Sequence, residues 1–458
     1  MREVVFDPGA FGPRAALLID GRLWEFAETR DDDGEVTDRL YLARVVRVEP
    51  RLDAAFLDYG EGLGFLTAKD ARFLGEDRGR LSIVRRLREG ERLIVQGLRE
   101  ADGDKGPRFT TDIRLFGLYL IYRPRAQGIE ISKRARRRER EQLAARGRAL
   151  FGTRPFLLRR FAAAADDRTL LAEAEHLEVR WRELQREAEG RSRPGPLAAA
   201  ESPIEHLFRW AMEREPQRLL VTDPALRAAL ARLLDAVAGA VRPELLGSGG
   251  ESAFAASGVD EMLEEALSPV VPLAGGGRLV IEPTLALTAV DVDGEGRDAL
   301  SLDLEAAAEL GRQLRLRNIG GNIIVDFVEL RRPGDRKRLQ QALEKAVRDD
   351  PLEVQIHPMS ALGILHLTRA KRGRSLLDRF RRPCSCCAGS GREPSLEARA
   401  ESLFRELRLR PHPAVSVALA PDLAGFLEGR GPPAWLRAAR LQRDPSLAPG
   451  CYRIEEGG

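Results

Sequence analysis

Alternating apolar and polar positions along the first 115 residues predict short β-strands. The segments EVVFD, RAALLID and RLWEFAE have the strand period. Asp20-Gly21, between the second and third segments, predicts a tight hairpin turn. From Arg39 to about Leu115, five more short strands follow with turns between them. Such a run predicts a small antiparallel barrel, for which the OB-fold is the usual architecture at this size.

Beyond residue 200 the pattern alternates between helical and strand periods. The helix PIEHLFRWAMER and the strand RLLVTD begin an α/β rhythm, which continues through the strands GRLVIEPT and LALTAVDVD. The arginine-rich segment LEAAAELGRQLRLRNIGG then predicts a helix ending at Gly320-Gly321. The strand NIIVDFVEL and the helix DRKRLQQALEKAVRDD complete the layer. The fold class is therefore multidomain α/β.

Acidic residues interrupt two of these apolar strands. At period two, one strand face carries Leu285, Leu287, Ala289, Asp291 and Asp293. Asp326 lies inside NIIVDFVEL, where a charge is costly unless it is paired, hydrogen-bonded or bound to a metal. If the two strands are neighbours, Asp291 and Asp326 meet at one sheet edge and suit Mg²⁺ with waters and a substrate phosphate. The alternative is that Asp326 caps a backbone group or pairs with a nearby arginine.

Composition limits the class of protein. A chain of 458 residues predicts about three or more structural units. No apolar run approaches the roughly 20 residues of a membrane span, and the N-terminus lacks the continuous apolar core of a signal peptide. We therefore expect a cytoplasmic protein without a membrane span. The net charge of +3 is too mild to indicate a polyanion partner.

Charge is nevertheless concentrated locally, in SKRARRRER, RQLRLRN and TRAKRGRS. Each basic segment by itself fits a solvated helix face better than a phosphate contact, whereas three together favour nucleic acid. In the predicted barrel, Phe56 and Phe65 fall in adjacent strands, where exposed rings could stack on bases, and Lys105 could meet a phosphate. The alternative places both phenylalanines in the core.

Three of the four cysteines stand together in PCSCCAGSG, as Cys384, Cys386 and Cys387. In a large chain without a secretory signal, this spacing predicts a metal knuckle with Cys384 and Cys387 as a CxxC pair. Zinc needs four ligands and the segment supplies two, or three with Cys386. The remaining ligands must come from Cys451, a distant histidine or a second copy of the chain.

Several motifs together resemble the bacterial ribonuclease E/G family. They are RVVRVEPRLDAAFLDYGEGLGFL, IEPTLALTAVDVD, LEAAAELGRQLRLRNIGGNIIVDFVEL, GILHLTRAKRGRSL and CSCCAGSG, in this order. The resemblance covers the chain through about Gly391, and the tail after Glu393 resembles the short ribonuclease G branch. It implies a Mg²⁺-dependent endoribonuclease that cleaves single-stranded RNA and leaves a 5′-phosphate and a 3′-hydroxyl. Its substrates would be rRNA, tRNA or mRNA precursors in processing or decay.

The resemblance also assigns roles to residues. It implies that Asp291 and Asp326 are catalytic and hold Mg²⁺. It implies RNA contacts by Phe56, Phe65, Lys105 and Arg159. Cys384 and Cys387 would join the same pair of a second protomer around one Zn²⁺, which implies a homodimer or a dimer of dimers.

The implied architecture is an OB-fold inserted in a ribonuclease-H-like domain, followed by a deoxyribonuclease-I-like nuclease domain. The ribonuclease-H-like domain is expected to consist of two separate segments, residues 1–35 and 199–266. Between them lie the OB-fold (36–115) and a 5′-end-sensor-like region (116–198). The nuclease domain (267–382), the zinc link (383–392) and a small dimerisation domain (393–458) follow.

Some positions depart from the family pattern. Asp293 and Asp303 stand where the family has Asn, so Asp293 is either an added Mg²⁺ ligand or the mark of an altered nuclease. Arg159-Arg160 replaces an Arg-Thr pair, and Glu353 falls on a family arginine, which puts 5′-monophosphate sensing in doubt. The alternative function is an RNA-binding family member with altered or lost catalysis. A zinc-linked assembly protein is a third hypothesis.

Overall fold

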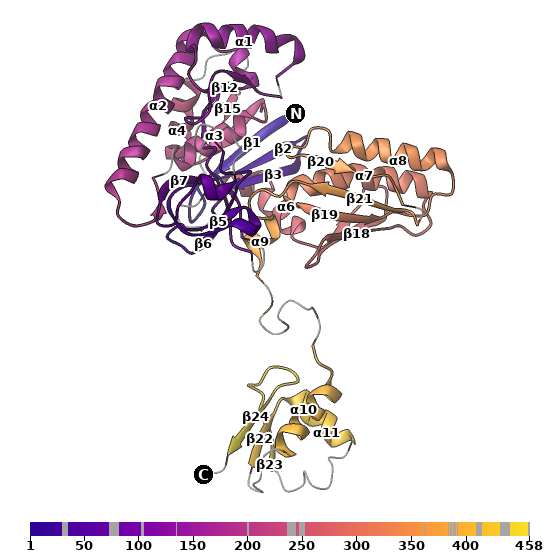
Figure 1. The fold of residues 1–458 in the computed structure, drawn as a ribbon. Helices are drawn as coiled ribbons and strands as arrows, with labels where there is room; N and C mark the ends of the chain where they lie inside the picture. Colours follow the sequence, from indigo (N-terminus) through magenta and orange to yellow (C-terminus); the bar gives the residue numbers. More distant parts are fainter. Residues whose placement is uncertain are drawn as a thin grey trace. The chain divides into compact units, whose positions relative to one another are not determined.

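The computed structural model describes the chain in two compact units, Met1–Phe380 and Arg381–Gly458 (Figure 1). It describes all residues except 30–34, 73–81, 102–104, 134, 199–200, 236–243, 247–251, 361, 383, 385–386, 388–390, 392, 409–414, 431–439 and 457–458. Among the described residues, no helix is both long and apolar enough to cross a membrane.

Two distant segments of the chain build the first sheet. Its strand order is β15-β14-β1-β2-β3, and β1 pairs with β14 in parallel, Val4 opposite Leu219. The predicted hairpin at Asp20-Gly21 is present, with φ of 51° and 75°, conformations that aspartate tolerates and glycine favours. The strands are β1 (Arg2–Asp7), β2 (Arg14–Ile19), β3 (Arg22–Glu28), β14 (Arg218–Val221) and β15 (Glu244–Leu246).

Helices cover both faces of this sheet, because alternate strand residues are apolar on either side. Val4 and Leu17 pack with Leu207 and Leu230 of α3 and α4, whereas Val5 packs with α5 and α6 on the other face. The helices are α3 (Pro203–Met212), α4 (Pro224–Asp235), α5 (Ala253–Ala256) and α6 (Val259–Ala266).

The predicted barrel is confirmed as five strands that close on themselves through the β4–β7 pairing. One pairing, β6 with β8, is parallel, so the barrel is not wholly antiparallel as expected. The aromatic rings of Tyr41, Tyr59 and Phe109 pack edge-on or tilted inside it. The strands are β4 (Leu40–Glu49), β5 (Ala54–Asp58), β6 (Leu63–Thr67), β7 (Arg92–Arg99) and β8 (Arg108–Thr110), with β13 (Gly195–Pro196) added to β4 and the 3₁₀ turns Pro50–Leu52 and Ile83–Arg85 between strands.

A helical segment with a small sheet follows the barrel. Leu170, Leu177 and Leu184 of the long helix α2 are buried at helical spacing against this sheet. The elements are β9 (Leu115–Phe116), β10 (Leu120–Tyr122), β11 (Glu130–Ile131), α1 (Arg137–Phe151), β12 (Phe156–Leu158), the 3₁₀ turn η3 (Arg160–Ala163) and α2 (Asp167–Gly190).

The third sheet has six strands in the order β16-β17-β18-β19-β21-β20. Its helices α7 and α8 lie on the same side of it (Figure 1), where their leucines pack with the buried residues of the strands. The elements are β16 (Val270–Pro272), β17 (Arg278–Pro283), β18 (Thr288–Asp293), α7 (Ala299–Leu316), β19 (Gly321–Asp326), α8 (Pro333–Ala346), β20 (Val354–Ile356), β21 (Ile364–Arg369) and α9 (Leu376–Phe380).

Two predicted boundaries in this part of the chain are wrong. β18 begins at Thr288, because the preceding residues form a turn in which Leu285 is fully exposed. α7 ends at Leu316 and not at the double glycine, since Asn318 takes the left-handed conformation at φ 50°. Gly320 is needed for close packing instead: a Cβ there would lie 2.8 Å from the Cα of Lys371.

The second unit is a small three-stranded sheet with two helices, in the strand order β23-β22-β24. Leu403 of α10 and Leu423 of α11 pack on Val417 of the central strand. Its elements are α10 (Leu396–Arg408), β22 (Val415–Leu419), α11 (Pro421–Arg430), β23 (Arg440–Arg443) and β24 (Tyr452–Glu456).

Candidate active site

Asp291 and Asp326 lie directly opposite each other on neighbouring strands. β18 and β19 pair in parallel with α7 as the crossover, and the register places Asp291 against Asp326. Both carboxylates are exposed, on the sheet face opposite the buried Val290 and Val325. The expectation that Asp326 is in the interior of a buried strand is wrong, because β19 ends at this residue.

Asp293 shares the face and strand of Asp291 but has a partner of its own. Arg278 of β17 is its cross-strand neighbour and donates from Nη2 to Asp293 Oδ2 at 2.7 Å. Both side chains are about half exposed, so the pair is weak and can exchange with solvent. In this arrangement, Arg278 offsets the charge that Asp293 adds to the site.

The donor set at this edge fits a magnesium ion with few protein ligands. No three His, Cys, Asp or Glu side chains of the described chain converge closely enough to hold a metal by themselves. Mg²⁺ commonly needs only one or two carboxylates, since waters and substrate phosphate oxygens fill the other positions. The opposed carboxylates of Asp291 and Asp326 meet that requirement.

Asp303 of α7 contributes to this region in a way that the sequence did not reveal. It is fully buried, and the backbone N–H of Val328 donates to its Oδ1 at 3.1 Å. Its Oδ2 has no hydrogen-bond partner among the described residues. Burial raises the pKa of Asp303 to about 7, and the single hydrogen bond from Val328 only partly opposes this shift. Asp303 therefore anchors the chain two residues after Asp326.

On the barrel, the two predicted aromatic residues face each other across strands. Phe56 of β5 is opposite Phe65 of β6, and their ring centroids are 5.4 Å apart in an edge-to-face arrangement. Both are partly exposed, so neither belongs to the barrel core. Arg47 of β4 is opposite Phe56 and places its guanidinium 4.8 Å from that ring centroid. Lys105 is exposed.

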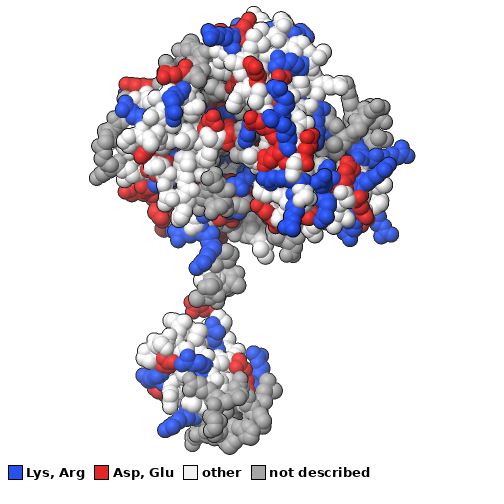
Figure 2. Space-filling model, turned by 90° about the vertical axis from the view of Figure 1, so that its left-hand side faces the viewer, with Lys and Arg blue, Asp and Glu red and all other residues white. Residues whose placement is uncertain are grey.

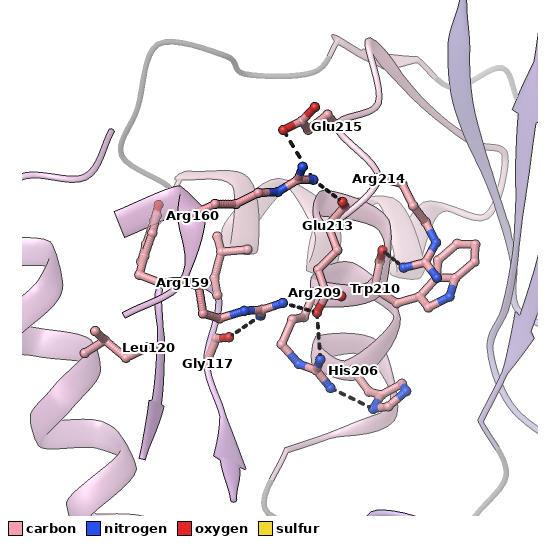
Figure 3. Close-up of polar contacts among 12 residues, drawn as sticks. Gly117, Leu120, Arg159, Arg160, His206, Arg209, Trp210, Glu213, Arg214 and Glu215 are labelled. Carbon is pink, nitrogen blue, oxygen red and sulfur yellow. Dashed lines mark hydrogen bonds and ion pairs between the residues drawn. The ribbon is translucent and has the colours of Figure 1, made fainter. Parts of the chain in front are cut away.

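Arg159 is held by protein groups (Figure 3). Its Nη2 lies 2.6 Å from Glu213 Oε1, and its Nη1 donates to the carbonyl oxygen of Gly117 at 2.7 Å. Burial alone would raise the pKa of Glu213, but Arg159 and Arg209 hold it below its usual range. Arg160 donates to the backbone oxygen of Glu213 at 2.6 Å. These contacts connect β12 and η3 with the end of α3.

The arginine-rich end of α7 docks this helix on the first sheet. Arg312 donates to the backbone oxygen of Leu23, and Arg315 is ion-paired with Glu25 of β3. Arg214, which follows α3, also donates from Nε to Glu25 at 2.8 Å. Only 12% to 15% of the side chains of Arg312 and Arg315 is exposed. The expectation of a solvated helix face or a phosphate contact is therefore wrong for these two residues.

The cysteine segment lies between α9 and α10. Cys384 is exposed and Cys387 is partly buried, and the backbone N–H of Gly391 points to Cys387 Sγ at 3.4 Å. An amide turned to the sulfur agrees with a knuckle that stabilises a thiolate. Cys386 lies outside the described residues, and Cys451 is partly buried between α11 and β24.

Lys and Arg are interspersed with Asp and Glu over the face drawn in Figure 2. On that face the basic side chains form no single continuous patch among the residues drawn in colour. This agrees with a net charge of only +3. Binding of a polyanion there would depend on local groups and not on a broad positive field.

A family model described as "Ribonuclease E/G family" matches residues 114–372. The chain belongs to the ribonuclease E/G family. The matched segment includes Arg159, Asp291 and Asp326 but not the barrel. The resemblance inferred from the sequence motifs is thereby confirmed.

Relatives of the family align over most of this chain. Ribonuclease E of Synechocystis sp. is 32% identical over 370 residues, 77% of this chain and 55% of that protein. Ribonuclease E of Escherichia coli is 31% identical over 418 residues, 86% of this chain and 39% of that protein. Ribonuclease G of Escherichia coli is 29% identical over 448 residues, 91% of this chain and 90% of the relative. The chain thus spans about half or less of these ribonuclease E proteins, and its alignment fits the short ribonuclease G branch.

Proposed function

We propose that the chain is a Mg²⁺-dependent endoribonuclease that cleaves single-stranded RNA in processing or decay and leaves a 5′-phosphate and a 3′-hydroxyl. The observation that carries the proposal is the register of β18 and β19, which opposes two exposed carboxylates near the carboxyl ends of parallel strands. Membership of the ribonuclease E/G family supports the same conclusion.

The residues of the site have distinct tasks in this proposal. Asp291 and Asp326 would hold Mg²⁺, which supplies positive charge to the phosphate oxygens and activates water for attack on phosphorus. Without a cation, the two carboxylates repel a phosphodiester, so RNA approach to this edge depends on the metal. Phe56 and Phe65 would stack on bases, while Lys105 would contact a phosphate on the barrel.

Arg159 would contact RNA only after it exchanges Glu213 for a phosphate. Its guanidinium already has a carboxylate at 2.6 Å and a carbonyl oxygen at 2.7 Å. A 5′-phosphate must therefore displace a charge-assisted contact to bind there. We infer that RNAs with 5′-phosphate and 5′-hydroxyl ends are cleaved at similar rates.

The proposal includes the rest of the architecture. The first sheet with its helices would be the ribonuclease-H-like domain, the barrel the OB-fold, and the third sheet the deoxyribonuclease-I-like domain. Cys384 and Cys387 would share one Zn²⁺ with the same pair of a second protomer, giving a homodimer. We further propose that the protein acts in the cytoplasm on rRNA, tRNA or mRNA precursors.

The test is cleavage of one short single-stranded RNA, carrying a 5′-phosphate or a 5′-hydroxyl, with and without Mg²⁺. The parent should cleave both RNAs only with Mg²⁺. Asp326→Asn should lose at least roughly 100-fold in rate, since it removes a charged metal ligand. The matched control is Glu344→Gln, an exposed acid of α8 on the opposite side of the sheet, which should leave the rate unchanged. An Asp326→Asn variant as fast as the parent would refute the assignment.

The second candidate function is an RNA-binding family member with altered catalysis. It is favoured by Asp293, which brings a third carboxylate and a bound Arg278 to the metal edge. This function predicts RNA binding with a steep salt dependence, but no Mg²⁺-dependent products from the parent. The same assay therefore separates the two functions.

A further inference from the structure

Two histidines on the third sheet stack on each other beside the candidate metal edge. His357 follows β20 and His366 lies in β21, and their ring centroids are 4.7 Å apart at an interplanar angle of 18°. The backbone N–H of His357 donates to the carbonyl oxygen of His366 at 2.9 Å, which extends the β20–β21 pairing and holds both rings in register. The ring of His357 is exposed and that of His366 is partly buried.

The strand register places these rings on the face that carries the catalytic acids. Asp326 is opposite Ile364, and Ile324 is opposite His366. Opposed residues share a sheet face, and so do residues two apart along a strand. His366 is therefore on the same face as Asp326, one row further from the strand end. The buried neighbours of His366, Leu365 and Leu367, point to the other face, against α7 and α8.

The row that contains the histidines has the character of a base-binding surface. Across four neighbouring strands it runs through Ala289, Ile324, His366 and His357. The two aliphatic residues are only partly buried, because both helices of this sheet lie on its other side (Figure 1). A flat apolar floor bounded by stacked rings suits a planar, weakly polar ligand better than a phosphate.

The distance between the histidines and the two acids also indicates which part of the RNA would bind there. His366 is one row along and one strand across from Asp326, and His357 is a further strand across, so they lie roughly 8 and 12 Å from it, a length that one to two nucleotides bridge. A phosphate at Asp291 and Asp326 would therefore place a neighbouring base over the histidine row.

We propose that His357 and His366 form a stacking platform for the nucleobase next to the scissile phosphate. The inference rests on the proposed function and deepens it by naming the groups that hold the substrate at the cut. The base continues the stack on the exposed ring of His357, and Ile324, on the other side of His366, contacts the sugar of the chain that leads back to the acids. The histidines act by stacking and not by proton transfer, so any aromatic ring can replace them.

The experiment combines protein variants with an RNA in which one base at a time is removed. For the parent, an abasic residue at the one position beside the cut should raise KM roughly 5- to 20-fold and leave kcat within about twofold. His357→Ala should raise KM by a similar factor on the intact RNA. The two losses should not add, since both remove the same contact. His357→Phe should restore the parent KM.

His176→Ala is the matched control, because it removes an exposed histidine from α2, outside the third sheet. It should change neither the KM for the intact RNA nor the increase in KM that the abasic residue causes. Additive losses, an unchanged KM in His357→Ala, or a His357→Phe variant as impaired as His357→Ala would each overturn the platform. His366→Phe provides a second check on proton transfer, since it keeps a ring that cannot titrate.

Failure of the proposed function gives a different result from failure of the stacking platform. If the parent gives no Mg²⁺-dependent products, the nuclease assignment fails, and the platform is then decided by affinity for the same intact and abasic RNAs. In that measurement, a weaker affinity of His357→Ala for the intact RNA, absent with the abasic RNA, supports the platform. Equal affinities of parent and variant overturn it.

Discussion

At the scale of single residues, Asp303 shows how an acid can serve as a neutral group. It occupies a fully buried position in α7 and receives one hydrogen bond, from the backbone of Val328. Its second oxygen has no partner within the described chain, so a proton there avoids an uncompensated buried charge. Below about pH 7, the side chain thus fixes the segment after Asp326 while it is mostly uncharged.

The stability of the protein should depend on the ionisation of Asp303. Its pKa is raised to about 7, so between its ordinary value and about 7 the folded state keeps a proton that the unfolded state has lost. Stability therefore falls as pH rises through this window, by at most about 1.4 kcal/mol per pH unit. Asp303→Asn should remove this fall and be more stable than the parent at pH 8, with a smaller difference at pH 5. Urea unfolding midpoints at the two pH values measure the effect, and equal differences at both would contradict it.

The two residues assigned to the metal could be predicted because the patterns that place them are local in the sequence. Period-two alternation places Asp291 on one strand face, and an intervening helix makes its strand a parallel neighbour of the strand of Asp326. The exposure of Asp326 could not be predicted, since the apolar run continues past the strand end into Phe327 and Val328. The stacking of the two histidines could not be predicted from the sequence, because their contact depends on the register of β20 with β21.

At the scale of secondary-structure elements, α7 acts as the joint between two sheets. One side of the helix packs on its own sheet, while Arg312 and Arg315 reach β3 of the first sheet. Glu25 of β3 is 6% exposed and accepts from both Arg315 and Arg214. Although burial would raise the pKa of Glu25, the two guanidinium groups hold it below its usual range.

Removing the charge of Glu25 should destabilise this joint. Glu25→Gln removes the hydrogen-bonded counter-charge of the buried Arg214 and Arg315, which costs about 3–5 kcal/mol. Glu295→Gln, at an exposed loop position, is the control and should change stability by less than about 0.5 kcal/mol. Chemical unfolding of the purified variants measures both values. A Glu25→Gln variant as stable as the control would show that the triad contributes no net stabilisation.

The elements themselves were largely predictable, whereas their contacts were not. Turn residues and alternation predicted the barrel strands, which the structure confirms as a closed five-stranded barrel. The composition of the basic segment RQLRLRN indicates a positive charge but not what that charge contacts. A helix with this composition could equally face solvent. Its docking depends on Glu25, a residue about 290 positions earlier that alternation alone would leave among the ordinary strand residues.

At the scale of the whole molecule, the proposed zinc link makes association testable. If two chains share one Zn²⁺ through Cys384 and Cys387, the double variant Cys384→Ser, Cys387→Ser should sediment as a monomer where the parent sediments as a dimer. A chelator should have the same effect on the parent. Cys451→Ser should remain dimeric, which distinguishes the knuckle from a general effect of losing a thiol. A double variant that stays dimeric would refute the shared site.

The first sheet has a consequence for synthesis on the ribosome. Val4 pairs with Leu219, so β1 must wait for more than two hundred further residues before its parallel neighbour exists. At translation rates of roughly 5–20 residues per second, this delay is on the order of 10–40 s. During that time the edge of β1 that will receive β14 is unpaired, while the barrel strands that follow can already close through β4 and β7. The N-terminal segment of the nascent chain therefore needs protection from wrong strand pairing for longer than the segments synthesised after it.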